Sequence, residues 1–146
     1  RLAGVYRRKI ADALVPLSGV EPFLCRLQDT YRVGLLTNGP VVAQRDKIDV
    51  LGLADAFDVS LVSGELAAGK PDERAFAALV DALDVDAAEA VYVGDDPEAD
   101  VRGASQASLY VVQVVYDGGP EPSPLADAHV ARSSLVATLP DIVHSL

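Results

Sequence analysis

The sequence predicts an α/β fold built on a doubly wound parallel sheet. Short apolar runs rich in β-branched residues alternate along the chain with segments of helical pattern. Polar residues follow several of these runs, either directly or one loop further on. Strands that alternate with helices of this length are typical of a parallel sheet covered on both faces. Such sheets bind ligands at the carboxyl ends of their strands.

The predicted elements follow the apolar pattern in order. Strands are expected at residues 33–36, 59–62, 91–93 and 110–115, with a last short strand around His129. Helices are expected at residues 2–14, 21–29, 40–51, 71–83 and 97–107, with an amphipathic helix at the end of the chain. The segment 71–83 shows the pattern most clearly, because Phe76, Leu79, Val80 and Leu83 recur at helical spacing and form one apolar stripe.

Composition indicates an acidic globular domain. The 146 residues suit one domain, and half of them are apolar, yet no apolar run reaches the roughly 18 residues needed to span a bilayer. The net charge of −10 disfavours nucleic acid and anionic membranes as partners, and resembles the surface of salt-adapted proteins. The single Cys25 excludes an internal disulfide, and its apolar neighbours predict a buried thiol, which fits a reducing cytoplasm.

Three carboxylates follow the run at residues 91–93. Asp95, Asp96 and Asp100 lie where a strand should end and a helix begin, and clustered carboxylates require a compensating charge. Mg²⁺ is the natural candidate, because it prefers oxygen ligands. The alternative is that Pro97 starts a helix whose first turn collects acids. That alternative explains Glu98, but it does not explain the acids before the proline.

A second group of residues suits a phosphate. Thr37 supplies a hydroxyl, and the backbone amides of Asn38 and Gly39 are further donors to an anionic oxygen. Lys70 lies between glycine and proline, where a cation would be fixed rather than mobile. Taken separately, Asn38 and Gly39 are equally typical of a plain turn, and Lys70 of a surface lysine.

Together these motifs resemble the haloacid dehalogenase superfamily of hydrolases. They are Leu36-Thr37-Asn38-Gly39, Gly69-Lys70-Pro71-Asp72, and Val93-Gly94-Asp95-Asp96 continuing to Asp100, in this order and spacing. The chain looks most like the phosphatase branch that carries a helical cap. This resemblance implies a Rossmann-like core at residues 16–146, with residues 1–15 forming the end of the cap.

The resemblance also implies roles for the site residues. It implies that the substrate is bound by Thr37, Asn38, Gly39 and Lys70. It implies that Asp95 binds Mg²⁺ directly and that Asp96 is either a second ligand or a neighbour of the ligands. The residues that would serve catalysis are Thr37, Lys70 and Asp100. The reaction would be hydrolysis of a small phosphorylated metabolite through an aspartyl-phosphate. The acid at Asp95 favours the phosphatase branch over the dehalogenase branch, which needs no Mg²⁺.

One departure from the family pattern concerns the nucleophile. The family attacks phosphorus with an Asp-x-Asp motif on its first strand, and upstream of Thr37 only Asp12 and Asp29 are available. Neither follows an apolar strand, so both are interpreted as structural. We therefore expect that the chain, which opens at Arg1, lacks the nucleophile strand and most of the cap, and is inactive alone although its parent is an enzyme.

The missing strand would lie centrally in the family's sheet. Its absence would leave two unpaired strand edges, which invite association into a homo-oligomer or help from another chain. Two alternatives to the enzyme remain open: a non-catalytic module that binds phosphate or metal, and a fragment that another chain completes.

Overall fold

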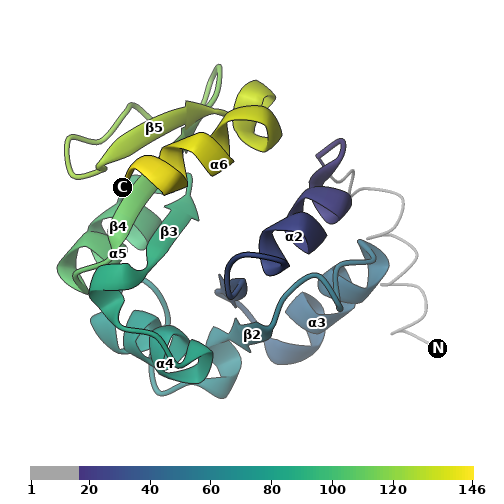
Figure 1. The fold of residues 1–146 in the computed structure, drawn as a ribbon. Helices are drawn as coiled ribbons and strands as arrows, with labels where there is room; N and C mark the ends of the chain where they lie inside the picture. The colour runs from purple at the N-terminus through teal and green to yellow at the C-terminus, as the bar shows by residue number, and fades with distance from the viewer. Residues whose placement is uncertain (1–16) are drawn as a thin grey trace.

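The computed structural model describes residues 17–146 and shows strands alternating with helices (Figure 1). The predicted helix at residues 2–14, the assignment of residues 1–15 to a cap, and Asp12 lie outside the described residues. The helices are α2 (Val20–Gln28), α3 (Val41–Val50), α4 (Glu73–Leu83), α5 (Gly103–Gln106) and α6 (Leu135–Ser145). The strands are β1 (Gly34–Thr37), β2 (Val59–Val62), β3 (Val91–Gly94), β4 (Tyr110–Val115) and β5 (Ala128–Ala131). Short helical turns lie at η1 (Ser63–Glu65), η2 (Ala87–Glu89), η3 (Pro97–Arg102) and η4 (Arg132–Ser134).

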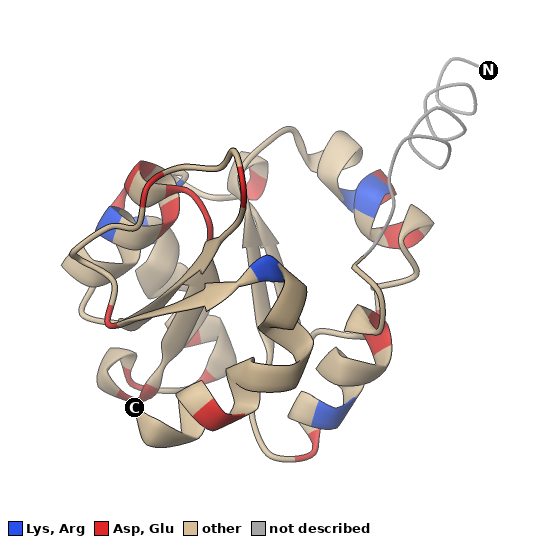
Figure 2. Ribbon diagram, turned by 90° about the horizontal axis from the view of Figure 1, so that it is seen from above, with Lys and Arg blue, Asp and Glu red and all other residues tan. Residues whose placement is uncertain are grey.

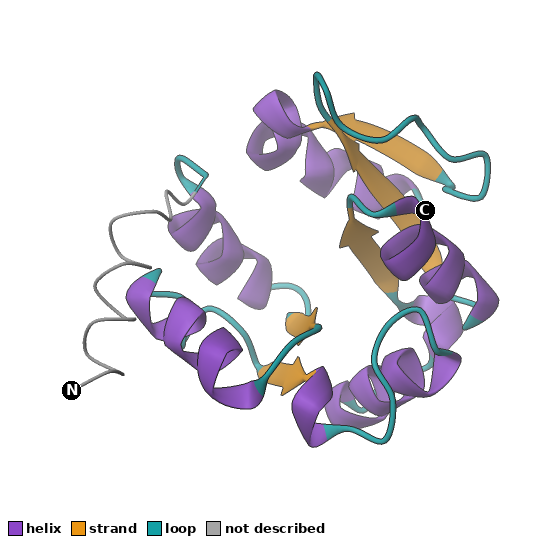
Figure 3. Cartoon of the chain, turned by 180° about the vertical axis from the view of Figure 1, so that it is seen from behind, coloured by secondary structure: helices purple, strands orange, loops and turns teal. Residues whose placement is uncertain are grey.

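All strand pairs are parallel, as the sequence predicts, but the strands form two sheets. β1 pairs with β2, and Thr37 lies opposite Val62. β3, β4 and β5 form the second sheet in that order. Among the described residues β1 and β3 do not pair with each other, so each leaves one edge free. Figure 3 shows the two groups of strands apart from one another.

A cavity of about 870 Å³ lies between the two sheets. We call it the inter-sheet slot. It is lined on one side by residues 34–36 of β1 and on the other by residues 91–94 of β3, with Phe23 of α2 and Leu139 of α6 also reaching it. The polar side chains of Lys70, Asp95 and Asp100 line it as well. The slot therefore lies where the sequence predicts two unpaired strand edges, and it runs alongside the residues of the predicted site.

Both faces of the second sheet are buried. Val111 and Val112 are neighbours on β4, and neither exposes any surface. Since successive side chains of a strand point to opposite faces, Val111 packs into one core with Phe76 of α4, while Val112 packs into another with Leu139 of α6. The predicted apolar stripe of α4 is buried in the first of these cores. The prediction of an α/β fold with a doubly covered parallel sheet is confirmed.

Two expectations from the sequence are wrong in detail. The segment 97–107 is not one α-helix: η3 is a π-helical turn, in which the amide of Val101 donates to the carbonyl of Asp96, and α5 follows it. Asp100 lies within this wider turn, and its side chain is buried. Cys25 is exposed rather than buried, because α2 turns Phe23 and not Cys25 into the core. Within residues 17–146, none of the helices has the length and apolarity required to cross a membrane.

Candidate active site

The centre of the site is an ion pair between Lys70 and Asp100. Lys70 Nζ lies 2.6 Å from Asp100 Oδ1, and the two side chains are only 13% and 8% exposed. Lys70 comes from the loop before α4 and follows η1, and Asp100 comes from η3, so the pair joins two loops at the carboxyl ends of β2 and β3. The sequence singles out both residues, and the structure brings them together.

The second carboxylate oxygen of Asp100 holds the loop that carries Asp95 and Asp96, which we call the acidic loop. Asp100 Oδ2 accepts hydrogen bonds from the backbone amides of Asp95 and Asp96, at 3.2 and 3.1 Å. Gly94 permits this close approach, since a Cβ at that position would lie 2.5 Å from Asp100 Cγ. The geometry agrees with the loop-orienting role that the family resemblance implies for Asp100.

Tyr92 completes the surroundings of the ion pair. Its hydroxyl donates to Asp100 Oδ1 at 3.2 Å and accepts from Lys70 Nζ at 3.0 Å. Burial, followed by the nearby charge of Asp100, raises the pKa of Tyr92 well above its ordinary value. The phenol therefore stays neutral and remains a donor to Asp100. Its ring meets that of Phe76 edge to face at 5.0 Å between centroids, which fixes its position.

Asn38 connects the chain after β1 to the loop that carries Lys70, which we call the lysine loop. Its side-chain amide donates to the carbonyl of Lys70 at 2.8 Å, and its Oδ1 accepts from the amide of Lys70 at 2.9 Å. Gly69 lies against this amide, and a Cβ there would be 2.9 Å from Asn38 Oδ1. Both hydrogen-bonding ends of Asn38 are engaged in placing Lys70. Through this contact Asn38 helps to arrange the site by placing Lys70.

Thr37 has its hydroxyl oxygen engaged and its hydroxyl proton available. The side-chain amide of Gln44 donates to Thr37 Oγ1 at 2.5 Å and to the carbonyl of Asn38 at 3.0 Å. Because a hydroxyl that accepts one bond can still donate another, Thr37 can donate to an anionic ligand. The amide of Gly39 instead donates to Ser63 Oγ at 2.9 Å. That amide, which the sequence suggests as a phosphate donor, is therefore already committed in this structure.

Asp95 and Asp96 differ in their surroundings although they are adjacent. Asp96 Oδ1 accepts from the amides of Glu98 and Ala99 at 2.9 and 2.8 Å, so it caps the following turn. Asp95 receives one side-chain hydrogen bond, from the hydroxyl of Tyr116 to Oδ2 at 3.2 Å. Capping of the following turn thus accounts for Asp96, which the sequence alone leaves unexplained, but it does not account for Asp95.

The carboxylate of Asp95 fits a magnesium ion. Its oxygens are hard ligands, and Mg²⁺ is held in proteins by one or two carboxylates together with substrate phosphates and waters. Within the described part of the chain, three or more acidic, histidine or cysteine side chains do not converge as a ready metal site. Asp95 would therefore hold the ion together with other oxygen ligands, such as those of substrate phosphate and water.

Several residues of the site escape detection in the sequence. Tyr92 lies in a valine-rich run and Gln44 in a helical segment, so each looks structural until its partner is known. Ser63 and Tyr116 follow the strands β2 and β4 directly. Their position directly after a strand is the one signal by which the sequence could have indicated them.

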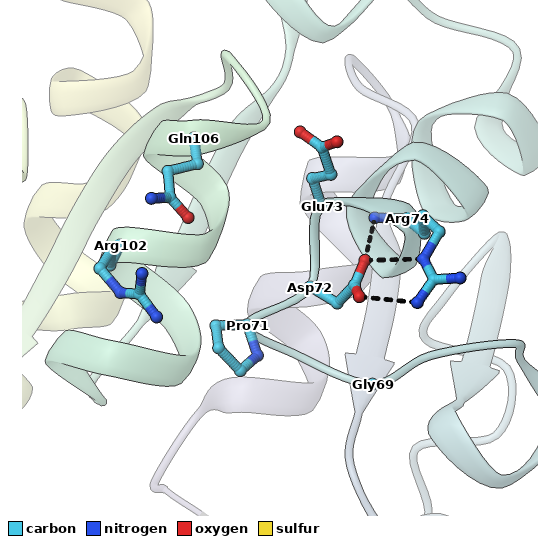
Figure 4. Close-up of a pocket in the computed structure, with 7 residues that line it drawn as sticks. All are labelled: Gly69, Pro71, Asp72, Glu73, Arg74, Arg102 and Gln106. Carbon is cyan, nitrogen blue, oxygen red and sulfur yellow. Dashed lines mark hydrogen bonds and ion pairs between the residues drawn. The ribbon is translucent and has the colours of Figure 1, made fainter.

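A second hollow, of about 840 Å³, opens on the outer side of the lysine loop (Figure 4). Both of its arginines are already paired: Arg74 binds Asp72 at 2.9 Å, and Arg102 binds Glu98. The hydrogen bond from Arg74 lowers the pKa of Asp72 to about 2. Lys70, Asp95 and Asp100 do not line this hollow, which is therefore separate from the candidate site. The sequence holds 22 acidic and 12 basic residues, and Figure 2 shows where those of the described residues lie.

The fold and these motifs define a class of hydrolase. A family model of haloacid dehalogenase-like hydrolases matches residues 3–108, and the chain belongs to this family. The solved structure of a haloacid dehalogenase-type phosphatase from Thermococcus onnurineus is similar, with a TM-score of 0.77 and 33% identity over 89% of this chain and 58% of that one. A 2-haloacid dehalogenase from Pseudomonas syringae has a TM-score of 0.76 and 32% identity, over 90% of this chain and 54% of that one.

Curated relatives include several phosphatases. A phosphoserine phosphatase of Thermus thermophilus is 46% identical over 82 residues, which cover 56% of this chain and 33% of the relative. A glyceraldehyde 3-phosphate phosphatase of Methanopyrus kandleri is 34% identical, over 69% of this chain and 44% of the relative. A pyrimidine 5'-nucleotidase of Escherichia coli is 30% identical, over 75% of this chain and 49% of the relative. The chain thus spans half or less of the length of these relatives.

Proposed function

We propose that the protein carrying this chain is a Mg²⁺-dependent phosphatase that hydrolyses a small phosphomonoester through an aspartyl-phosphate. The observation that carries the proposal is the position of Thr37, Lys70 and Asp95 at the carboxyl ends of the strands: Thr37 ends β1, Lys70 lies in the loop before α4, and Asp95 follows β3. They combine a hydroxyl donor, a fixed cation and a metal-binding carboxylate. The phosphatases among the relatives support a phosphorylated metabolite as substrate.

Each side chain has a defined task in this reaction. The Thr37 hydroxyl, oriented by Gln44, donates to an oxygen of the transferring phosphoryl group. Lys70, fixed by Asn38 and Asp100, offsets negative charge of phosphate and nucleophile. When bound, Mg²⁺ supplies further stabilisation of charge on the phosphoryl oxygens. Asp95 would hold it, and Asp96 supports the loop from the cap of η3.

The attacking carboxylate is the part that residues 17–146 do not provide. Asp29 ends α2, and it does not line the slot. We propose that the nucleophile arrives on a strand that fills the inter-sheet slot and pairs with β1 and β3. A carboxylate at the carboxyl end of such a strand would lie between Lys70 and Asp95. On this proposal the chain by itself is inactive, and its free edges favour self-association.

The test is hydrolysis of a panel of phosphomonoesters by the protein that carries this chain, with and without Mg²⁺. Asp95→Asn is expected to abolish Mg²⁺-dependent turnover and to weaken Mg²⁺ binding. The matched control, Asp55→Asn, changes an exposed carboxylate outside the site and should leave both unchanged. The proposal fails if the unaltered protein shows no Mg²⁺-dependent hydrolysis and Asp95→Asn leaves Mg²⁺ affinity the same.

A second candidate function is a module that binds phosphate or metal without turnover. The supporting observation is that, in the described residues, the carboxylates beside Lys70 and Asp95 are already engaged: Asp100 pairs with Lys70, and Asp96 caps η3. This candidate predicts that phosphate binds without hydrolysis and that fluoroberyllate forms no adduct with an aspartate. An adduct detected by mass spectrometry or fluorine NMR excludes it.

The acidic surface bears on the partners and on the compartment. A net charge of −10 disfavours nucleic acid as a partner, and we propose that the protein acts in the cytoplasm on a small metabolite. Similarity to salt-adapted proteins predicts that the fold is stabilised rather than destabilised by molar salt.

A further inference from the structure

Tyr116 is the one side chain of the described residues that hydrogen-bonds to the carboxylate of Asp95. It follows β4 directly, so it stands at the carboxyl end of the strand next to β3, which carries Asp95. Its hydroxyl lies 3.2 Å from Asp95 Oδ2. No hydrogen bond from residues 17–146 reaches Oδ1, which remains available to a ligand.

The ring of Tyr116 is held from two sides. The guanidinium of Arg132, the first residue after β5, lies 3.7 Å from the ring centroid. Gly119 lies against the ring edge, since a Cβ at that position would be 2.7 Å from Tyr116 Cε2. The amide of Gly119 also donates to the carbonyl of Tyr116 at 3.0 Å, which closes a turn beneath the ring. Arg132 forms no ion pair within the described residues, and its guanidinium stacks on this ring.

The loop that follows Tyr116 is anchored from below by Gln113. This side chain is fully buried. Its Nε2 donates to the carbonyl of Glu121 at 3.2 Å, and its Oε1 accepts from the amide of Ser123 at 2.6 Å. Because a buried amide that loses its partners is costly, these bonds keep the loop in place. Tyr116 therefore belongs to a fixed part of the structure rather than to a loose surface loop.

From this geometry we propose that Tyr116 is a positioning residue for Asp95. The hydroxyl fixes the rotamer of the carboxylate by binding Oδ2, and it leaves Oδ1 directed to the cation site. The amide of Asp95 is bound to Asp100 at the same time, so both the backbone and the side chain of Asp95 are held. Partners of this kind pre-organise metal ligands, and losing them lowers metal affinity about 10-fold to 100-fold. The cation part of the proposal rests on the proposed function, whereas the rotamer part does not.

The test compares Tyr116→Phe with Tyr110→Phe. Both substitutions remove one hydroxyl, but Tyr110 lies at the opposite end of β4, and its hydroxyl forms no hydrogen bond to a site residue within residues 17–146. The first measurement is the pair of Hα–Hβ couplings of Asp95 by NMR without metal. The second is Mg²⁺ affinity by calorimetry on the same samples. Thermal unfolding of both variants controls for general loss of structure.

The expected result is a single Asp95 rotamer in the unaltered protein and in Tyr110→Phe, and averaged couplings in Tyr116→Phe. Mg²⁺ affinity should fall about 10-fold in Tyr116→Phe alone. Arg132→Gln, which removes the stacked guanidinium but keeps the hydroxyl, should give a smaller change in the same direction.

The outcomes separate the two proposals. Unchanged couplings in Tyr116→Phe overturn the positioning role, whatever the metal does. Changed couplings with no Mg²⁺ binding by any sample uphold the positioning of Asp95 and count against the proposed function. Changed couplings with unaltered Mg²⁺ affinity overturn the claim that the fixed rotamer serves the cation.

Discussion

Lys70 Nζ lies 2.6 Å from Asp100 Oδ1, and both side chains are almost entirely shielded from solvent. The same carboxylate accepts from Tyr92 and from two backbone amides of the acidic loop. One buried carboxylate thus connects the lysine loop, the core and the loop that carries Asp95. A buried pair of this kind adds little net stability when formed, but breaking it is costly, because the remaining charge is left without compensation.

Lys70→Met is therefore expected to lower the free energy of unfolding by about 3 kcal/mol. In the double variant Lys70→Met/Asp100→Asn the charge on both sides is gone, so the combined loss should be smaller than the sum of the single losses. Urea unfolding of the four proteins measures this coupling. The control is Arg102→Gln, which breaks the exposed pair with Glu98 and should cost less than about 1 kcal/mol. Strict additivity of the two single variants would contradict the interpretation.

Thr37 gives a prediction about its hydroxyl. Thr37→Val keeps the shape of the side chain but cannot donate to phosphate or accept from Gln44, so kcat is expected to fall about 100-fold. Thr37→Ser retains the hydroxyl and should remain within a few-fold of the unaltered enzyme. Steady-state hydrolysis by the protein that carries this chain provides the measurement. Equal activity of the valine and serine variants would remove the hydroxyl from the proposed mechanism.

The sequence predicts the strands well because their signal is local. The runs at 59–62 and 110–115 are rich in valine, and the structure has strands β2 and β4 with these same bounds. The segment 97–107 was harder, since its wide turn depends on the burial of Asp100 against Lys70, which lies 30 residues away in the chain. Propensity within the segment carries no information about that contact.

The residues of the candidate site also form two groups: those that the sequence indicates and those that become apparent only in the fold. Thr37, Lys70 and Asp95 are visible in the sequence because each follows a predicted strand, at its end or one loop further on, and carries a chemically distinctive group. Tyr92 and Tyr116 are not visible, because their importance arises from contacts with Asp100 and Asp95 that the fold creates. For Asp96, the sequence leaves open a metal ligand or a neighbour, and the bonds to the first turn of η3 favour the second interpretation.

Gly94 gives a prediction about close packing. In Gly94→Ala the new methyl group would lie 2.5 Å from Asp100 Cγ, so the acidic loop must shift or the ion pair must break. We expect a loss of about 1–3 kcal/mol in the free energy of unfolding, measured by urea. In an Asp100→Gly background the obstructing Cβ and carboxylate are both absent, and the added methyl group should cost much less. An equal cost in both backgrounds would show that Asp100 is not the source of the clash.

Tyr92 gives a prediction about alkaline pH. Its pKa is raised in the folded state, chiefly by burial, while in the unfolded chain it titrates near its ordinary value of about 10. Below pH 10 both states keep the proton, and stability does not depend on this group. Above pH 10 the unfolded state releases the proton while the folded state retains it, so stability falls by up to about 1.4 kcal/mol for each further pH unit.

Urea unfolding between pH 9 and 11 measures this slope of stability against pH. Tyr92→Phe should flatten the slope relative to the unaltered chain. If Tyr92→Phe unfolds with the same alkaline slope as the unaltered chain, the buried phenol is not its cause.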